Sequence, residues 1–482
     1  MTIEKIEDLL TSVGVSLCDD SRKILPGDVF VAVKGNSIDG HDHIDEAFEK
    51  GARAVVCEEG QIPKRHPRED DIAAVIDTRR MLGTLAGKKF RYPSNDLIVY
   101  GVTGTNGKST TVSIIESVFS SMGVPCGMTG TVFNKTRGDI LERSDMTTPG
   151  VLNLNRMLRE MADSGKKAAA VEVSSHSLQQ ERVFGIGFDT AIFTNITPEH
   201  LDYHGDMASY LKAKARIFDN LKSGAVVVLN ADDTMVRELA HGLKKEQVIT
   251  FGFNESSGLY CGNIITRPYG AEFDVFYEGK NVGRVRSLLP GRHNIYNVLA
   301  ATAAFLKNGF SPEDVIKGLE KARSVPGRLD KVTSRAPFSV FVDYAHTPDA
   351  IKSVLESLKT ITKGKLFCVF GCGGNRDRSK RPVMGKIAAD LCDSIILTDD
   401  NPRNEDPGRI LGEIERGVPT GTNCCIIRDR SDAITEAVKR AGEGDTVLIA
   451  GKGHENYQIF ADRTIHFDDK EEALDALKKM GY

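Results

Sequence analysis

A glycine-rich turn between two apolar stretches constrains the fold of this chain more than any other feature. Residues 97–102 are mostly apolar, and residues 112–119 (VSIIESVF) repeat apolar side chains at helical spacing. GTNGKST lies between them at residues 104–110. A buried strand, a glycine-rich loop and a helix in this order turn backbone N–H groups toward the helix N-terminus, where they bind phosphate. The order therefore predicts a parallel α/β sheet that holds the phosphates of ATP.

The loop also carries the side chains that phosphate binding needs. Lys108 supplies a positive charge, and Ser109 or Thr110 offers a hydroxyl to Mg²⁺. The strict GxxxxGK[ST] pattern is not met, because Val102 stands at its first glycine. A glycine-rich turn with an exposed lysine is the alternative interpretation. We expect ATP to be bound by Gly104, Thr105, Asn106, Gly107, Lys108, Ser109 and Thr110.

The length of 482 residues predicts about three domains, because a single core stops growing well below this size. We expect an α/β fold with a small N-terminal α/β domain (residues 1–95), a central domain with a P-loop-type parallel sheet (96–327) and a C-terminal domain with a Rossmann-like sheet (328–482). VPGR, at residues 325–328, has the turn residues of a linker. In the first domain, β-rich runs at 28–33 and 54–56 predict strands, and residues 44–50 predict a helix.

Charge and hydropathy exclude some classes of partner. The net charge of −4 offers no general attraction to nucleic acid or to an anionic membrane. The first residues, MTIEKIEDLL, lack the apolar core of a signal peptide, and no apolar run approaches the roughly 20 residues of a membrane span. We therefore expect a cytoplasmic monomer that binds neither nucleic acid nor membrane.

Polar residues follow two strands of the predicted central sheet. The strand at residues 168–173 carries Glu172 near its end, and the strand at 190–193 leads to His200. Ligands bind beyond the carboxyl ends of parallel strands, so both side chains are candidate Mg²⁺ contacts. A carboxylate in an apolar strand is costly unless paired or bound to metal, whereas His200 is equally well explained as a loop histidine. Lys214, on the next predicted helix, is by composition a solvated lysine.

The segment that closes the central domain predicts further strands and one helix. Short β-rich runs at residues 224–290 should continue the sheet and add an antiparallel layer. GRHNIYN, at residues 291–297, then begins an alanine-rich helix. Asn294 and Asn297 fall one turn apart on it, where their amides could bind an adenine edge or simply belong to a helix cap.

Four apolar strands beyond residue 328 each end in a polar loop and lead to a helix. This alternation predicts a doubly wound sheet with its loops at one rim. The loops are DYAHTP (343–348), GCGGNRDR (371–378), TDDNPR (398–403) and GKGHE (451–455).

With these loops identified, the chain resembles the Mur ligase family, and within it the branch that extends UDP-N-acetylmuramoyl-L-alanyl-D-glutamate in peptidoglycan synthesis. The resemblance covers nearly the whole chain. Its motifs, in chain order, are DSR, PGD, GTNGKST, TTP, EVSSHSL, EHLDYHGDM with the AK after it, GRHNIYN, VPGR, DYAHTPDA, GCGGNRDRSKRPVMG, DNPR and GKGHE. It implies an ATP-dependent acid–amino-acid ligase that uses Mg²⁺.

The resemblance also implies roles for individual residues. The family's catalytic and metal positions match Lys108, Ser109, Glu172, His200 and Lys214. Lys214 matches a lysine carbamylated with CO₂, a change that turns a cation into an anion able to bind Mg²⁺. Further ATP contacts match Asn294, Arg328, Asp343 and His346. The UDP-muramoyl-dipeptide positions match Ser21, Asn36, Ser37, Ile38, Thr147, Thr148, Ser174, Gln180 and Arg182.

The incoming amino acid would occupy the C-terminal loops. The family's pocket matches Arg376, Asp400, Asn401, Pro402, Arg403, Gly451 and Glu455. The intact DNPR resembles the version that selects meso-diaminopimelate, whose distal carboxylate would meet the planar fork of Arg403. Glu455 could pair with the distal ammonium. Asn375 departs from the family, which usually has Asp there.

The implied reaction joins diaminopimelate to the D-glutamyl γ-carboxylate through an acyl phosphate. The nearest alternative is the same ligase using L-lysine. A folylpolyglutamate synthase would share the ATP loop, but the DNPR and GKGHE loops argue against it. An ATP-binding regulator that forms no bond would need the phosphate loop without an amino-acid pocket.

Overall fold

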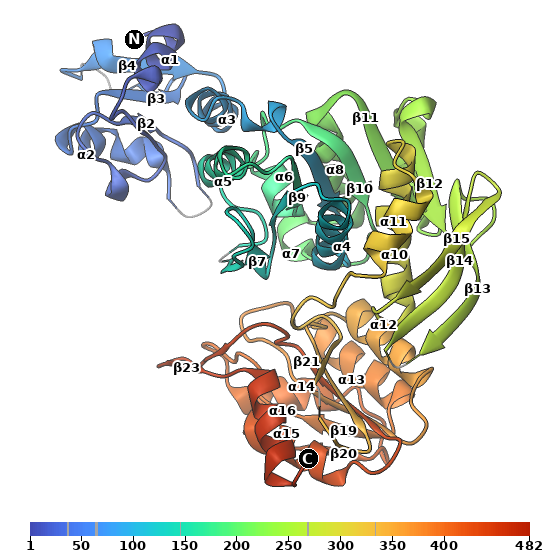
Figure 1. Ribbon diagram of the computed structural model, residues 1–482. Helices are drawn as coiled ribbons and strands as arrows, with labels where there is room; N and C mark the ends of the chain where they lie inside the picture. The colour runs from blue at the N-terminus through green and yellow to red at the C-terminus, as the bar shows by residue number, and fades with distance from the viewer. Residues whose placement is uncertain (36–37, 63–65, 145, 268, 333) are drawn as a thin grey trace.

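The computed structural model describes residues 1–482 except 36–37, 63–65, 145, 268 and 333. Figure 1 shows three parts along the chain: a small N-terminal part, a large central part and a C-terminal part drawn beneath the central one. Their sheets have four, nine and six strands, and two two-stranded sheets accompany them. The predicted α/β fold with three domains is confirmed, whereas the domain boundaries at 95/96 and 327/328 stay predictions.

The N-terminal sheet is parallel throughout, in the order β1-β2-β3-β4. Its strands are β1 (Leu17–Cys18), β2 (Val29–Val31), β3 (Ala54–Glu58) and β4 (Ile72–Val75). Its helices are α1 (Ile3–Thr11), α2 (Ile44–Glu49) and α3 (Thr78–Lys89), with 3₁₀ turns at Ser21–Lys23, Gly40–His43, Glu69–Asp71 and Pro93–Asn95. The predicted strands and helix are present. β1 and β4 have only 2 and 4 residues, too few to show a period in the sequence.

The central sheet has the order β15-β14-β13-β12-β11-β10-β5-β9-β6. Its strands are β5 (Ile98–Thr103), β6 (Cys126–Thr129), β9 (Ala168–Glu172), β10 (Phe188–Phe193), β11 (Leu221–Asn230), β12 (Val248–Gly252), β13 (Leu259–Arg267), β14 (Gly270–Tyr277) and β15 (Lys280–Ser287). β6 to β13 pair in parallel, and β14 and β15 then pair antiparallel along one edge. The expected continuation of the sheet is confirmed, but the antiparallel strands β14 and β15 widen this same sheet and do not form a separate layer.

Helices cover both faces of the central sheet. They are α4 (Lys108–Ser121), α5 (Val151–Asp163), α6 (Ser175–Gln179), α7 (Leu201–His204), α8 (Met207–Ala215), α9 (Thr234–Glu238), α10 (Arg292–Lys307) and α11 (Pro312–Leu319), with 3₁₀ turns at Arg216–Asn220, Leu239–Gly242 and Lys245–Gln247 and a small sheet of β7 (Phe133–Asn134) and β8 (Glu142–Arg143).

Neighbouring residues of β5 show how the two faces are filled. Successive side chains of a strand point to opposite faces. Tyr100 packs its ring against Phe119 of α4 and Phe305 of α10, with centroid distances of 5.2 and 5.5 Å. Val99 belongs instead to the core formed with Leu154 of α5. The strand that leads into the phosphate loop is thus fixed from both sides.

The C-terminal sheet has the order β16-β17-β21-β18-β19-β20, with only β16 antiparallel to its neighbour. Its strands are β16 (Asp330–Val332), β17 (Ser339–Asp343), β18 (Leu366–Phe370), β19 (Ser394–Leu397), β20 (Cys424–Ile426) and β21 (Thr446–Ala450), and a hairpin adds β22 (Tyr457–Ile459) and β23 (Thr464–His466). Its helices are α12 (Pro348–Lys359), α13 (Lys380–Leu391), α14 (Pro407–Glu415), α15 (Arg430–Arg440) and α16 (Asp469–Lys479).

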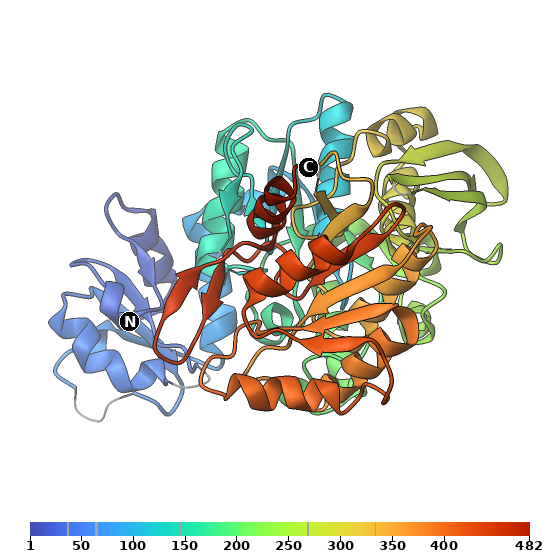
Figure 2. The same cartoon turned by 90° about the horizontal axis from the view of Figure 1, so that it is seen from below.

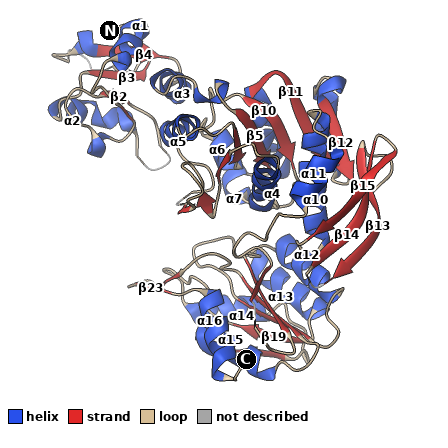
Figure 3. Cartoon of the chain, viewed as in Figure 1, coloured by secondary structure: helices blue, strands red, loops and turns tan. Residues whose placement is uncertain are grey.

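The C-terminal part is doubly wound, as the alternation of strands and loops predicts. Residues of α12, α13 and α14 pack with Phe341 on one face, whereas α15 and α16 pack with Val340 and Val342 on the other. Figure 2 shows this sheet from below with helices on its two sides, and Figure 3 shows the same alternation of helix and strand.

The chain passes from the central to the C-terminal part through residues 323–327. Ala322 is still packed in the central core. Gly327 accepts a hydrogen bond from the N–H of Tyr344 (2.9 Å), and a Cβ at Gly327 would lie 2.2 Å from the backbone nitrogen of His454. Across the described ranges, no helix is long and apolar enough to cross a membrane.

Candidate active site

The phosphate loop adopts a conformation that only glycine suits at two positions. Gly104 and Gly107 have φ of +141° and +88°. A Cβ at Gly104 would lie 1.9 Å from the Thr194 hydroxyl, and one at Gly107 would lie 2.2 Å from Oδ1 of Asn297. Helix α4 begins at Lys108, so Lys108, Ser109 and Thr110 form its first turn. The backbone N–H groups of this turn can bind an anion.

Lys108 lies folded against its own loop. Its Nζ donates to the carbonyl oxygens of Gly104 (3.0 Å) and Thr105 (2.7 Å). Burial lowers the pKa of Lys108, although Glu199 and Glu172 act in the opposite direction. The side chain therefore carries a poorly solvated positive charge at the point where a nucleotide phosphate would bind.

Glu172 ends β9 in a buried position, 2 % exposed. Its two carboxylate oxygens accept hydrogen bonds from the N–H and the hydroxyl of Thr131, at 2.9 and 3.0 Å. Its backbone oxygen accepts one from Thr148 (2.8 Å). Glu172 thus joins the TTP turn to the strand end, and it reaches the site through Thr131.

Lys214 is buried, with 1 % of the residue exposed. Its Nζ donates to the carbonyl of Gly104 (2.8 Å) and lies 4.6 Å from the ring centre of Tyr210. Burial, followed by the charge of Lys108, places the pKa of Lys214 well below its ordinary value. The interpretation of Lys214 as a solvated surface lysine is therefore wrong.

His200 belongs to a group of rings beside the phosphate loop. Its backbone is left-handed (φ +56°), and its ring lies 4.6 Å from that of His176. Burial lowers the pKa of both histidines, that of His176 to about 4.

Glu199 is a residue that the sequence analysis missed. One of its carboxylate oxygens lies 3.5 Å from Nε2 of His346 and 3.8 Å from Nε2 of His200. Burial raises the pKa of Glu199, but the contact with His346 and the nearby positive charges outweigh it and hold the pKa below its ordinary value. The available signal was its position directly before His200 in the polar tail of β10. Glu199 joins the central part to the C-terminal loop that carries His346.

A cavity of about 1750 Å³ brings most of the predicted residues together. Its wall includes loops of the central part and loops of the C-terminal part. The predicted residues on the wall are Thr105, Asn106, Gly107, Lys108, Ser109, Thr110, Thr147, Thr148, Ser174, Arg182, His200, Asn294, Arg328, Asp343, His346 and Glu455. The other predicted site residues for which the structure is described do not line the cavity; they are Gly104, Glu172, Lys214, Gln180, Ser21, Ile38, Arg376, Asp400, Asn401, Pro402, Arg403 and Gly451.

The predicted sugar-nucleotide residues divide into two groups. Arg182 donates to the carbonyl of Thr148 (3.1 Å) and to Oε1 of Gln180 (2.6 Å), so this group is joined at the cavity. Ser21 instead donates to Glu46 (3.2 Å) within the N-terminal part. Ile38 is 61 % exposed there. The predictions for Asn36 and Ser37 lie outside the described residues.

Two predicted ATP contacts are already engaged with the protein. The amide of Asn294 donates to the carbonyl of Pro290 (2.7 Å) and accepts from Asn297 (3.0 Å). The carboxylate of Asp343 accepts from the N–H groups of Leu329 (2.6 Å) and Ala345 (2.7 Å). Both residues shape the cavity wall by fixing the backbone around it. Arg328 lies with its guanidinium 4.7 Å from the centre of the Tyr344 ring.

The predicted amino-acid pocket forms a connected group beside the cavity. Asn401 donates to Glu455 (2.9 Å) and accepts from Lys452 (3.2 Å). Lys452, 0 % exposed, was missed because a lysine in a glycine loop has the same composition whether it is buried or solvated. Arg403 has a left-handed backbone (φ +51°) and donates from Nη1 to the carbonyl of Gly374 (3.0 Å). Arg376 donates to the carbonyl of Asn375 (3.2 Å).

The residues beside the phosphate loop suit a magnesium ion held mainly by nucleotide phosphates. Among the described residues, no group of three or more His, Cys, Asp and Glu side chains is placed to hold a metal by itself. Mg²⁺ usually takes one or two carboxylates together with phosphates and water. The Ser109 hydroxyl and the Glu199 carboxylate line the cavity and are donors of this kind.

A parallel sheet with a phosphate loop, facing a doubly wound sheet across one cavity, defines an ATP-binding α/β enzyme of several domains. Three family descriptions match successive parts of the chain: the Mur ligase family catalytic domain at residues 16–90, the Mur ligase middle domain at 102–305, and the Mur ligase glutamate ligase domain at 327–453. The chain belongs to the Mur ligase family.

Individual relatives agree with this assignment. The chain is 41% identical over 463 residues to UDP-N-acetylmuramoyl-L-alanyl-D-glutamate--2,6-diaminopimelate ligase 1 of Clostridium acetobutylicum, covering 96% of this chain and 94% of the relative. The ligase of the same name from Geobacillus thermodenitrificans is 41% identical over 474 residues, covering 96% and 95%. A solved structure with that ligase name has a TM-score of 0.69 at 33% identity, covering 97% and 95%. The fold is shared by MurF ligase from Thermotoga maritima in complex with ADP (TM-score 0.66, 21% identity, 98% of both chains).

Proposed function

We propose that this protein is an ATP-dependent ligase that joins meso-2,6-diaminopimelate to the D-glutamyl γ-carboxylate of UDP-N-acetylmuramoyl-L-alanyl-D-glutamate. The relatives at 41% identity carry the name of this activity. The observation that carries the proposal is a single cavity lined both by Lys108 of the phosphate loop and by Glu455 of the GKGHE loop. A phosphoryl donor and an amine acceptor bound at these two places would share one space.

The reaction would proceed in two steps. A γ-carboxylate oxygen attacks the γ-phosphorus of ATP, and the bond from that phosphorus to the β,γ-bridging oxygen breaks. ADP departs, and the substrate now carries an acyl phosphate. The diaminopimelate amine then attacks the acyl carbon, phosphate leaves with the bonding electrons, and the nitrogen loses a proton. No protein nucleophile is required. The chain contributes positioning and charge, with Lys108 neutralising phosphate oxygens and the helix α4 N-terminus donating N–H groups.

When bound, Mg²⁺ would neutralise negative charge on the nucleotide phosphates. We assign its protein contacts to Ser109, Glu172, His200 and a carbamate on Lys214. The lowered pKa of Lys214 supports the last assignment, because a neutral amine is the form that adds to CO₂. Glu199 adds a further carboxylate on the same wall.

The C-terminal loops would select the amino acid. The carboxylate at the far end of diaminopimelate separates it from lysine, and a guanidinium can bind a carboxylate with two parallel N–H groups. Nη1 of Arg403 donates hydrogen bonds to protein carbonyls. Its Nε and Nη2 have no hydrogen-bond partner among the described residues, so this edge of the fork is open to a carboxylate. Glu455, which accepts from Asn401 (2.9 Å), would accept from the distal ammonium.

The substrates also support a place of action. ATP and a UDP-linked sugar are cytoplasmic metabolites, so we place the reaction in the cytoplasm.

A coupled assay of ADP release tests the proposal. The protein is given ATP, Mg²⁺ and UDP-N-acetylmuramoyl-L-alanyl-D-glutamate, with meso-diaminopimelate, L-lysine or no amino acid. We expect ADP release that requires both the muramoyl dipeptide and diaminopimelate. A preference for L-lysine would overturn the choice of amino acid. ADP release that is independent of the muramoyl dipeptide would overturn the ligase assignment and favour an ATP-binding regulator.

A further inference from the structure

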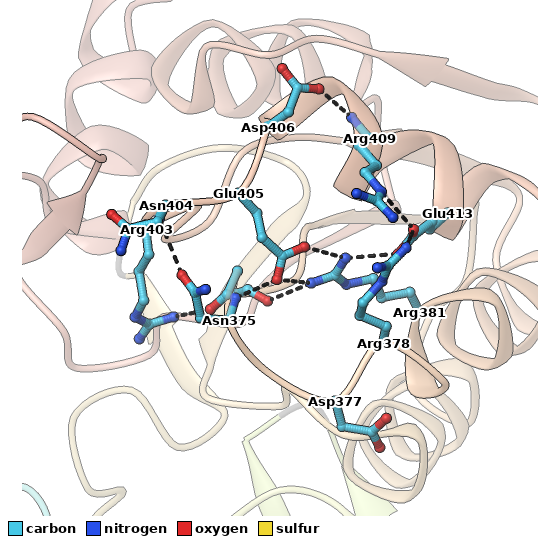
Figure 4. Close-up of polar contacts among 12 residues, drawn as sticks. Asn375, Asp377, Arg378, Arg381, Arg403, Asn404, Glu405, Asp406, Arg409 and Glu413 are labelled. Carbon is cyan, nitrogen blue, oxygen red and sulfur yellow. Dashed lines mark hydrogen bonds and ion pairs between the residues drawn. The ribbon is translucent and has the colours of Figure 1, made fainter.

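An arginine outside the cavity organises the loops of the predicted amino-acid pocket. Arg381 lies in the first turn of α13, and its side chain is 0 % exposed. Its Nη1 donates to Oε2 of Glu405 (2.9 Å) and to Oε2 of Glu413 on α14 (2.7 Å). Its Nη2 donates to Oε1 of Glu405 (3.1 Å) and to the carbonyl of Gly373 (3.2 Å). Figure 4 shows this guanidinium between the two carboxylates.

Glu405 extends the contact from Arg381 to both loops of the pocket. Glu405 lies two residues after Arg403, the last residue of the DNPR loop. Its Oε1 also accepts from the backbone N–H of Asn375, in the glycine loop. The side-chain oxygen of Asn375 in turn accepts from the N–H of Asn404 (3.1 Å), as Figure 4 shows. One carboxylate, itself held by Arg381, therefore ties the two loops together.

Adjacent carbonyls connect Arg381 to Arg403. Arg381 binds the carbonyl of Gly373, and Nη1 of Arg403 binds the carbonyl of Gly374. The backbone here leaves no room for a side chain, since a Cβ at Gly374 would lie 1.8 Å from the carbonyl oxygen of Pro402. The next peptide, Gly374–Asn375, offers its carbonyl to Arg403 and its N–H to Glu405, so a shift of this turn would move the guanidinium of Arg403.

The chemistry of the network favours positioning over stability as its role. Burying Arg381 with the carboxylate of Glu413 removes charge from water, and apolar replacements of buried ion pairs are often neutral or stabilising. Hydrogen bonds from Arg378 and Arg381 lower the pKa of Glu413 to about 2, so this carboxylate stays ionised near neutral pH. A charged network of this kind fixes direction, because a guanidinium fork binds carboxylates in one plane.

We propose that Arg381 is a positioning residue for amino-acid selection: it fixes the Gly373–Gly374 peptide and, through Glu405, the DNPR loop, so that the open edge of Arg403 faces a distal carboxylate. The inference rests on the proposed function, since it concerns how the same pocket distinguishes diaminopimelate from lysine. Arg381 itself touches neither substrate nor reacting atom.

Arg381→Lys and Glu405→Gln test the inference on the full chain by the ADP-release assay. Lysine keeps the charge but loses the fork, and glutamine keeps an oxygen for the N–H of Asn375. For each variant we expect the KM for diaminopimelate to rise about tenfold, with kcat and the KM for ATP within about twofold. The ratio of kcat/KM for diaminopimelate to that for L-lysine should fall by a similar factor.

The control is Arg159→Lys, in the central part. Arg159 also holds two carboxylates, Asp96 (2.7 Å) and Asp163 (2.9 Å), and within the described ranges it has no hydrogen bond or ion pair to a pocket loop. The Arg159→Lys variant should have lower thermal stability, but its ratio of kcat/KM for diaminopimelate to that for L-lysine should be unchanged. Combining Arg381→Lys with Glu405→Gln should raise the KM for diaminopimelate by less than the product of the single effects, because the two residues act in one path.

The outcomes separate the two proposals. If the wild-type protein selects diaminopimelate but Arg381→Lys and Glu405→Gln leave the ratio unchanged, or change the KM of every substrate alike, Arg381 is structural only and the inference is overturned. If Arg381→Lys does not fold, Glu405→Gln alone decides between these results. If the wild-type protein releases no ADP with either amino acid, the proposed function fails, and the inference fails with it.

Discussion

The ε-amino groups of Lys108 and Lys214 donate to the same acceptor, the carbonyl oxygen of Gly104, at 3.0 and 2.8 Å. Two ammonium groups this close repel each other in a buried site, so one of them is best neutral. Burial and the charge of Lys108 hold the pKa of Lys214 well below its ordinary value, which favours the neutral form of this amine. A neutral amine beside a phosphate loop is poised to react with CO₂, which connects this geometry to the proposed carbamate.

Replacing Lys214 tests that connection. We expect Lys214→Ala to lower the rate of ADP release by about 100-fold or more, because it removes a charged group of the proposed metal site. A short carboxylic acid such as acetate should restore part of the activity by replacing the carbamate. Lys212→Ala, on the same helix, is the control and should remain active. Full activity of Lys214→Ala without any added acid would show that the lysine has no catalytic part.

A substitution of Gly107 tests whether the phosphate loop must lack a side chain where it comes closest to α10. Gly107→Ala places a Cβ 2.2 Å from Oδ1 of Asn297 and strains a backbone at φ +88°. We expect the affinity for ATP to fall by about tenfold or more, measured by nucleotide titration. Gly123→Ala is matched in φ (+75°) but has open space around it. It should lose about 1 kcal/mol of stability and keep its ATP affinity. Equal ATP affinity in both variants would contradict the importance of the close approach.

Arg403 tests the amino-acid choice directly. In Arg403→Lys a point charge replaces the fork, so kcat/KM for diaminopimelate should fall by about tenfold or more while that for L-lysine changes by about threefold or less. The assay compares ADP release with each amino acid. Arg463→Lys, at an arginine whose side chain is 61% exposed, serves as the control. Equal losses for both amino acids would remove the selectivity argument.

The ring of His293 should make the protein less stable as the pH falls below neutrality. Its ring lies between the central and C-terminal parts, with Nδ1 3.2 Å from the hydroxyl of Ser357 on α12, and burial lowers its pKa from 6.5 to about 4. Between these values the unfolded chain binds more protons than the folded one, so stability falls as the pH falls through this window.

Urea unfolding of the wild type and His293→Gln at about pH 7.5 and about pH 5 measures this effect. The variant should lose less stability than the wild type on going to the lower pH. His241→Gln removes a ring that is 81% exposed and controls for the loss of an imidazole. The same pH dependence in His293→Gln and the wild type would contradict the prediction.

The strand ends and loops could be predicted because parallel strands place their polar tails at one edge, as Glu172 and the DNPR loop do. Local composition predicted less. The start of α4 was placed at Val112, four residues late, because GKSTT has weak helix propensity, whereas the turn at Gly107 sets the start at Lys108.

Whether a given side chain is buried or solvated could not be predicted from the sequence, for a physical reason. Lys214 and Lys452 are buried by contacts from distant segments, and nothing in their neighbours along the chain distinguishes them from solvated lysines. The amides of Asn294 and Asn297 had the right spacing to face a ligand, but each bonds within the protein. Glu199 gained its partner His346 only when two parts of the chain came together.

The attachment of Gly327 has a mechanical consequence. Its carbonyl accepts from the N–H of Tyr344, and a Cβ on it would lie 2.2 Å from the backbone nitrogen of His454, so Gly327 moves with the C-terminal sheet, while Ala322 stays with the central core. Any swivel between the two bodies is thereby confined to residues 323–326. The pivot belongs to the wall of the cavity, which includes Pro326, so a small rotation there moves the C-terminal loops relative to the phosphate loop across the cavity.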